Sequence, residues 1–336
     1  MMSFLARRMA RVVLILLSVE LLVFLLVHAI PGSPWDTPEN QMRALRNVAM
    51  SDATLAMRNA YYGLDLPVWR QFTRYLFGDV HIDGEFHCGV VCGNLGPSLR
   101  QAGRGVDDIL FTAPEGQSPW NSRFGYTLRL VALAFGLVFA VGLPLGILSA
   151  LWNRSPFERS LSTLFTTLAA IPVFVLGLLQ VMIFASWLKW IKVVPDWAQP
   201  KYWLISAILL AIIPTANMIR LTRTAMLEAM AGEYIRTARA KGLTRAKTIW
   251  KHVLPNAFNT ILTYLLPLFA ELLAGSFIIE GIFGFPGFGR EYWDSINALD
   301  FAMIMGITFI YALAITLANL VLEILYTLFN PQLMAQ

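Results

Sequence analysis

Long apolar runs separated by polar segments dominate the chain. They lie near residues 12–30, 128–152, 160–190, 203–222, 258–282 and 301–329. A helix needs about 20 mostly apolar residues to cross a bilayer, and it satisfies its own backbone hydrogen bonds in lipid. The pattern predicts an all-α, polytopic membrane protein with six transmembrane helices and both termini on the same side of the membrane.

Basic residues mark one side of this arrangement. Arg7, Arg8 and Arg11 precede the first run, and Arg154 and Arg159 lie between the second and third. The loop after the fourth run adds Arg236, Arg239, Lys241, Arg245, Lys247 and Lys251. Because Lys and Arg collect in cytoplasmic loops, these segments and both termini are predicted to be cytoplasmic. The first run is longer than the apolar region of a signal peptide, so we expect it to be kept as the first span.

Composition agrees with a membrane protein. Of 336 residues, 57% are hydrophobic and only 14% are charged, whereas a soluble domain carries about 25% charged residues. The formal net charge of +5 is concentrated in short loops, which indicates membrane topology and argues against nucleic-acid binding.

The polar segment 31–122 is expected outside. It mixes acids with a similar number of arginines, and residues 38–77 are predicted to be helical with breaks at Gly63 and Pro67. A connector of this length is unusual, so we interpret it as a small lid or docking platform. The expected organisation is residues 1–122, the first helix with this extracytoplasmic insert, followed by residues 123–336, a five-helix core that contains a cytoplasmic loop at 223–257.

Both cysteines, Cys88 and Cys92, lie in this external segment, near His81 and His87. Disulfides persist outside the cytoplasm, and a Cys88–Cys92 disulfide would close the insert locally. A metal site is chemically possible, but strict ligand spacing is absent, and we assign none. Two unrelated thiols remain the third alternative, because spacing alone does not define a disulfide.

The basic loop at residues 233–255 predicts two short amphipathic helices. Gly242 separates them as a left-handed cap, Thr244 is suited to cap the second, and Pro255 is expected to end it. Tyr234, Ile235 and Ala238 share one face at helical spacing. Such helices are suited to docking onto a soluble partner. The alternative is a solvated basic loop that binds lipid headgroups.

Three prolines, Pro172, Pro214 and Pro267, fall inside the third, fourth and fifth runs. Each removes a backbone donor and permits a kink. The kinks are either ordinary bending in a helix bundle or part of a pathway that opens and closes.

Acids inside the apolar runs are a second group of candidates. They are Glu20, Glu271, Glu280 and Glu323. Charge is costly in the bilayer, so these side chains are expected to face the protein interior or an interface. Glu271 and Glu280 are the candidates for the translocation path, and contact with a helix of a sister subunit is the alternative.

The loop between the last two runs, residues 281–289, has four glycines and one proline. Phe285 and Pro286 are candidates for an outer gate. A contact with an external binding protein and a simple structured loop at the membrane interface stay open.

Several segments together resemble one family. Gly242 stands 13 residues before Pro255, the spacing of the "EAA loop" in bacterial ATP-binding-cassette importer permeases. The triplet falls on Arg236, Thr237 and Ala238, of which only Ala238 matches the consensus, and His252 replaces an isoleucine. In addition, Phe24–Pro34, Thr127–Leu130 and Gly284–Gly289 resemble, in the same order, parts of the dipeptide, oligopeptide and nickel branch.

The resemblance implies a type I importer fold in the bacterial inner membrane. The implied coupling residues are Glu233, Tyr234, Arg236, Thr237, Ala238, Gly242 and Pro255. The implied partners are a homologous second permease subunit, two ATPase subunits that bind ATP and Mg, and an external solute-binding protein. Peptides are the expected solute, while nickel chelates, glutathione and sugars stay open.

The energy source distinguishes an importer permease from the alternative classes, a secondary carrier or channel and a membrane anchor or sensor. The sequence has no G-x-x-x-x-G-K-[ST] motif, so we expect no ATPase site and no cofactor in this chain. A self-powered secondary carrier or channel would need paired inverted repeats, discontinuous helices or a charged coupling site, and we find none of these in the sequence. A membrane anchor or sensor would not need the docking loop.

Overall fold

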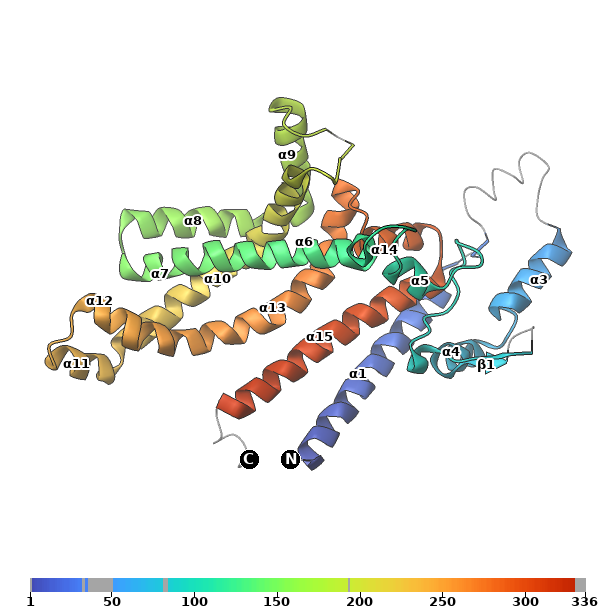
Figure 1. Ribbon diagram of the computed structural model, residues 1–336, viewed down its shortest axis with the longest axis horizontal. Coiled ribbons are helices and arrows are strands. Elements are labelled where there is room, and N and C mark those ends of the chain that lie inside the picture. Colours follow the sequence, from blue (N-terminus) through green and yellow to red (C-terminus); the bar gives the residue numbers. More distant parts are fainter. Residues whose placement is uncertain (1, 32–33, 36–50, 81–83, 193, 330–336) are drawn as a thin grey trace. The chain divides into compact units, whose positions relative to one another are not determined.

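The computed structural model describes residues 2–31, 34–35, 51–80, 84–192 and 194–329, and Figure 1 shows its helices. In this described part, five helices are long and apolar enough to cross a membrane. They are Ala6–Ala29, Arg123–Leu151, Pro200–Ala231, Arg245–Phe283 and Phe301–Val321. A bent pair of helices supplies a sixth crossing if it is counted as one span.

That bent pair corrects the expectation of one helix over 160–190. Helix α8 (Pro156–Ala170) and the helical stretch Val173–Trp187 meet at an angle of 98°. The second stretch comprises α9 (Val173–Val181) and a π-helical segment, Met182–Trp187. Pro172 lies directly before α9 and has an extended backbone. Proline lacks the amide donor that would continue α8, so the helix breaks here.

Pro214 and Pro267 behave differently, because α10 (Pro200–Ala231) and α13 (Leu254–Phe283) both continue through them. These two helices pack against each other, and the Tyr264 hydroxyl of α13 donates to the Pro214 carbonyl at 3.2 Å. This bond joins α13 to α10 at the level of Pro214.

The chain divides into two compact units, and each is described by itself. Unit 1 comprises residues 1–126 and 286–316, and unit 2 comprises residues 127–285 and 317–336. The division expected from sequence, at residue 122, differs from this one because residues 286–316 pack with the N-terminal unit.

Unit 1 begins with α1 (Met2–Ala29) and contains the polar insert at residues 31–122. The insert has α3 (Asp52–Tyr62), α4 (Val68–Phe77) and α5 (Val106–Phe111), with 3₁₀ turns at Val90–Cys92 and Pro119–Asn121. Helix α14 (Phe288–Asn297) and the first part of α15 (Phe301–Phe329) complete the unit.

The predicted breaks at Gly63 and Pro67 are confirmed. Gly63 ends α3 with φ of 72°, and Pro67 precedes α4. After α4, strands β1 (Asp79–Val80) and β2 (Phe86–His87) form an antiparallel pair, with Asp79 opposite His87. This is the one sheet in the described residues, which otherwise follow the expected all-α class.

Unit 2 is a bundle around α10. Most of α6 (Arg123–Leu137), the π-helical segment Val138–Gly142 and α7 (Leu143–Leu151) form one continuous span. This span packs against α10 through two glycines. A Cβ at Gly142 would lie 2.8 Å from Met218 Cβ, and one at Gly146 would lie 2.5 Å from Thr222 Cβ. Small residues four apart allow close backbone approach between membrane helices.

Candidate functional site

The loop that follows α10 contains the candidate coupling residues. Helix α11 (Glu233–Ala240) begins directly after Gly232, and four residues separate its end from the start of α12 (Arg245–Thr248). Gly242 has φ of 78°, which confirms the predicted left-handed turn. Thr244 caps α12 by accepting from the Lys247 amide, as predicted. The sequence therefore fixes the sharp reversal between the two helices.

The two faces of α11 have different roles. Ile235 and Ala238 are 2% and 7% exposed, so this stripe packs against the chain itself. Of the predicted face of Tyr234, Ile235 and Ala238, the last two are therefore used internally, and Tyr234 is 42% exposed. The outer face consists of exposed side chains, among them Glu233, Tyr234, Arg236 and Thr237. Tyr234 is also anchored, because its hydroxyl donates to the Ala229 carbonyl at 2.9 Å.

Pro255 does not end a helix, contrary to the sequence prediction. A π-helical segment, Ile249–Val253, joins α12 to α13, and Pro255 lies in the first turn of α13. The helical run Arg245–Phe283 is thus continuous. The first-turn position needs no amide donor from proline, and the wider π turn changes the hydrogen-bond pattern just before it.

A polar bridge holds the α7–α8 turn to α10. The Arg223 guanidinium lies 3.2 Å from a Glu158 carboxylate oxygen and donates to the Asn153 side-chain oxygen at 2.8 Å. Arg223 lies two turns before the end of α10. Any displacement of this end of α10 is therefore shared with the turn that connects the second and third apolar runs.

The intramembrane acids lie in different surroundings. Glu280 of α13 is fully buried and accepts from the Thr127 and Ser276 hydroxyls at 2.8 and 2.9 Å. Glu271 is exposed on α13. An acid exposed on a membrane helix favours a polar path or a partner subunit over lipid. Glu20 of α1 is buried beside Tyr75, and the side chain of Glu323 lies outside the described residues.

Phe285 is enclosed by aromatic rings. Its ring centroid lies 4.4 Å from that of Trp197 and 4.8 Å from that of Trp203, both in edge-on orientation. The Arg129 guanidinium lies 4.8 Å above the Trp203 ring. Phe285 is thus a packed anchor of unit 2, and Pro286 is the first residue of the adjoining segment of unit 1.

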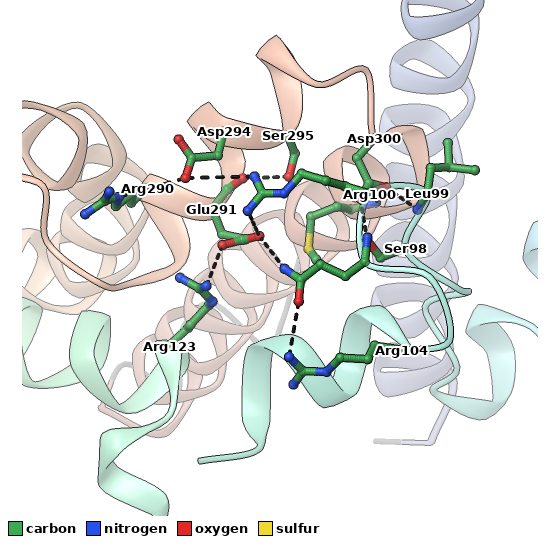
Figure 2. A network of polar contacts seen from close by, with 12 residues as sticks. Ser98, Leu99, Arg100, Arg104, Arg123, Arg290, Glu291, Asp294, Ser295 and Asp300 are labelled. Atoms are coloured by element: carbon green, nitrogen blue, oxygen red, sulfur yellow. Dashed lines mark hydrogen bonds and ion pairs between the residues drawn. The ribbon is translucent and has the colours of Figure 1, made fainter. Parts of the chain in front are cut away.

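A polar network in unit 1, shown in Figure 2, was missed by the sequence analysis. Asp300 is 1% exposed and accepts from the Ser98 hydroxyl at 2.5 Å and from the Leu99 and Arg100 amides at 3.1 and 3.2 Å. It also accepts from the Met303 amide at 3.2 Å, so it caps α15. An aspartate immediately before an apolar run is a recognisable cap signal, but its partners near residue 98 are not.

Glu291 of α14 is the second buried carboxylate of this network. Its carboxylate oxygens lie 2.9 Å from the Arg123 guanidinium and 3.6 Å from that of Arg100, and the side-chain amide of Gln101 donates to it at 3.2 Å. Two arginines and an amide compensate the cost of burying this charge. The network ties the loop at residues 98–101 and the start of α6 to α14.

Cys88 and Cys92 are joined by a disulfide with a Cα–Cα distance of 5.9 Å. His81 lies outside the described residues. Within the part of the chain that the structure describes, groups of three or more His, Cys, Asp or Glu suited to hold a metal are absent.

Several apolar spans, with a basic loop of two short helices after α10, define a multi-pass membrane protein. Two family models match the chain. "Binding-protein-dependent transport system inner membrane component" covers residues 142–334, and its N-terminal counterpart covers residues 1–117. The chain belongs to this family, the permeases of ATP-binding-cassette importers, and it is a multi-pass transport component with the type I importer fold.

Curated relatives match along almost their whole length. Dipeptide transport system permease protein DppB of Bacillus subtilis (strain 168) is 33% identical over 95% of this chain and 93% of its own length. DppB of Escherichia coli (strain K12) is 30% identical over 99% of both chains. Glutathione transport system permease protein GsiC of Salmonella paratyphi A is 30% identical over 98% of both chains.

Among solved structures, the chain is similar to one titled "Crystal structure of an amino acid ABC transporter with histidines". The TM-score is 0.47 at 23% identity, and the match covers 63% of this chain and 93% of that chain.

Proposed function

We propose that this chain forms one half of the path through which an ATP-driven importer moves short peptides into a bacterial cell. The observation that carries the solute class is the end-to-end similarity to two dipeptide permeases. The glutathione permease relatives fit the same class, because glutathione is itself a tripeptide. Nickel chelates and sugars remain alternatives within the wider branch.

The proposed partners are a second, homologous permease, two ATPase subunits that bind ATP and Mg, and an external solute-binding protein. Helix α11 supports this assembly, because its outer face is exposed and its inner face is held by Ile235 and Ala238. Its basic surroundings favour a cytoplasmic position. Both termini are then cytoplasmic, and the insert with Cys88 and Cys92 faces outward.

Solute passage requires polar groups in the membrane. The exposed Glu271 of α13 is the proposed path residue, and Glu280, held by Thr127 and Ser276, is proposed to stabilise the outer end of the same helix. Phe285 and Pro286 are proposed to belong to the outer gate. ATP binding and hydrolysis on the partners would move α11 and alternate the access of the path.

The test is uptake by reconstituted vesicles. The chain, its second permease, both ATPases and the binding protein are combined, and a radiolabelled dipeptide, glutathione and a nickel chelate are offered separately. We expect uptake of a peptide that requires ATP and every partner. An imposed gradient is worth about 2.3 kcal/mol per charge per 100 mV, so a secondary carrier would accumulate solute without ATP, and that result would refute the proposal. Uptake of nickel alone would overturn only the solute class.

A further inference from the structure

Helix α4 of the external insert lies against the outer part of α1. Three successive turns of α1 meet it. The His28 ring nitrogen Nε2 lies 3.1 Å from the Gln71 side-chain oxygen. The Phe24 and Phe72 ring centroids are 5.1 Å apart. The Tyr75 hydroxyl lies beside the buried carboxylate of Glu20.

This pairing sets the depth of α4. The apolar stretch of α1 runs to its last residue, Ala29. At 1.5 Å per residue, Phe24 and Glu20 lie about 8 and 14 Å inward of that end. A hydrocarbon core is about 30 Å thick, so these two levels fall within its outer half. The C-terminal end of α4 therefore lies at the height of the acyl chains of the outer leaflet.

The side of α4 that faces away from α1 exposes large apolar side chains. A helix surrounded by water would be expected to expose polar side chains on that side. Trp69 and Phe77 are 69% and 58% exposed, and with Thr73 they occupy one face at four-residue spacing. Arg70, half-exposed, borders this face and lies 3.5 Å from Asp79. An apolar face with Trp and a bordering Arg is typical of a helix in the membrane interface.

The segment after α4 adds further exposed apolar side chains. Val80, Phe86 and Val91 are 57%, 63% and 70% exposed. Their backbone packs closely against α4, since a Cβ at Gly89 would clash with the Tyr75 carbonyl and one at Gly78 would clash with the His87 carbonyl. The Cys88–Cys92 disulfide closes the turn that presents Val91.

We propose that α4, strands β1 and β2 and the disulfide-closed turn form a lipid-inserted foot in the outer leaflet. Trp69, Phe77, Phe86 and Val91 contact acyl chains, and Arg70 lies at the level of the headgroups. The depth of α4 in the outer leaflet favours lipid as the contact of this surface over the proposed binding protein, which would dock from the aqueous side. The neighbouring surface of α1 also favours lipid. Leu21 and Leu25 flank the residues of α1 that contact α4, and both are exposed within the membrane-spanning segment.

The test uses the full chain in nanodiscs. The emission of Trp69 is isolated as the difference between the native chain and Trp69→Phe, in plain lipid and in lipid brominated along its acyl chains. We expect brominated lipid to remove most of the difference emission. The control adds Met57→Trp to Trp69→Phe, because Met57 is 72% exposed on α3 of the same insert, and its emission should persist.

Photo-crosslinking supplies a second readout that does not need Trp69. A benzophenone amino acid replaces Phe77, the nanodiscs are illuminated, and adducts are identified by mass spectrometry. We expect a phospholipid adduct whether or not the binding protein is added. A Trp69 difference emission that brominated lipid leaves intact would overturn the proposal. So would a Phe77 adduct with a protein chain in place of lipid, whichever solute the importer carries.

Discussion

Replacing Gly242 by valine should uncouple ATP hydrolysis from transport without preventing membrane insertion. Gly242 has φ of 78°, and a Cβ built there meets nothing within 4 Å. The cost is therefore confined to the backbone, about 1–2 kcal/mol for a left-handed conformation. That free energy corresponds to a roughly 5–30-fold change in the population of the native turn, which re-aims α11 relative to α12.

The assay compares peptide-stimulated ATPase activity of the assembled importer with the amount of inserted chain. We expect insertion near the native level and a large loss of stimulation in Gly242→Val. Gly242→Asn should retain more of the ATPase stimulation than Gly242→Val, because asparagine tolerates the left-handed conformation better than valine does. The matched control is Gly116→Val, since Gly116 has φ of 75° and equally open space in the external insert. Native coupling in Gly242→Val, or an equal loss in Gly116→Val, would refute the reasoning.

Three further changes test other parts of the structure. Asp300→Ala removes a helix cap and leaves buried donors unpaired, so it should cost about 2–3 kcal/mol and shorten the thermal half-life of the purified chain. Asp294 forms partly exposed ion pairs with Arg100 at 3.9 Å and Arg290 at 3.8 Å, so the Asp294→Ala substitution should change that half-life little. Gly146→Leu places a side chain where Cβ alone would lie 2.5 Å from Thr222. Its monodisperse yield by fluorescence-detected gel filtration should collapse, whereas Gly136→Leu, with open space, should not. Replacing both cysteines by serine removes a short disulfide worth about 2 kcal/mol. Limited proteolysis near residues 84–92 of the detergent-purified chain, where no bilayer shields this segment, should then accelerate with the spans intact, and an unchanged rate would contradict a stabilising role.

Local patterns in the sequence predict the local structure well. Hydropathy alone places the spans, because a bilayer demands apolar length. Gly242 and Thr244 reveal the turn between α11 and α12 through backbone preferences that act over a few residues. The break at Pro172 was expected only as a kink, and its angle of 98° depends on packing within unit 2. Pro255 was misread because its role depends on the π-helical turn before it.

The sequence does not reveal contacts between residues that are far apart along the chain. Ser98 and Asp300 are 202 residues apart, and Gln101 and Glu291 are 190 apart. Each side chain has an ordinary local interpretation, and only the fold brings them together. Ala238 shows the same limit in α11, because helical spacing defines its face but not whether that face meets the chain itself or a partner.

Helix α10 has a mechanical consequence. Its 32 residues make a rod about 48 Å long. One end continues through Gly232 into α11, and the other carries Trp203 against Phe285. A rod of this length pivoting by about 5° carries its far end through roughly 4 Å. If α11 is the coupling helix, as proposed above, its displacement needs no relay of side-chain rearrangements to reach the other end of α10, because a single helix spans the distance.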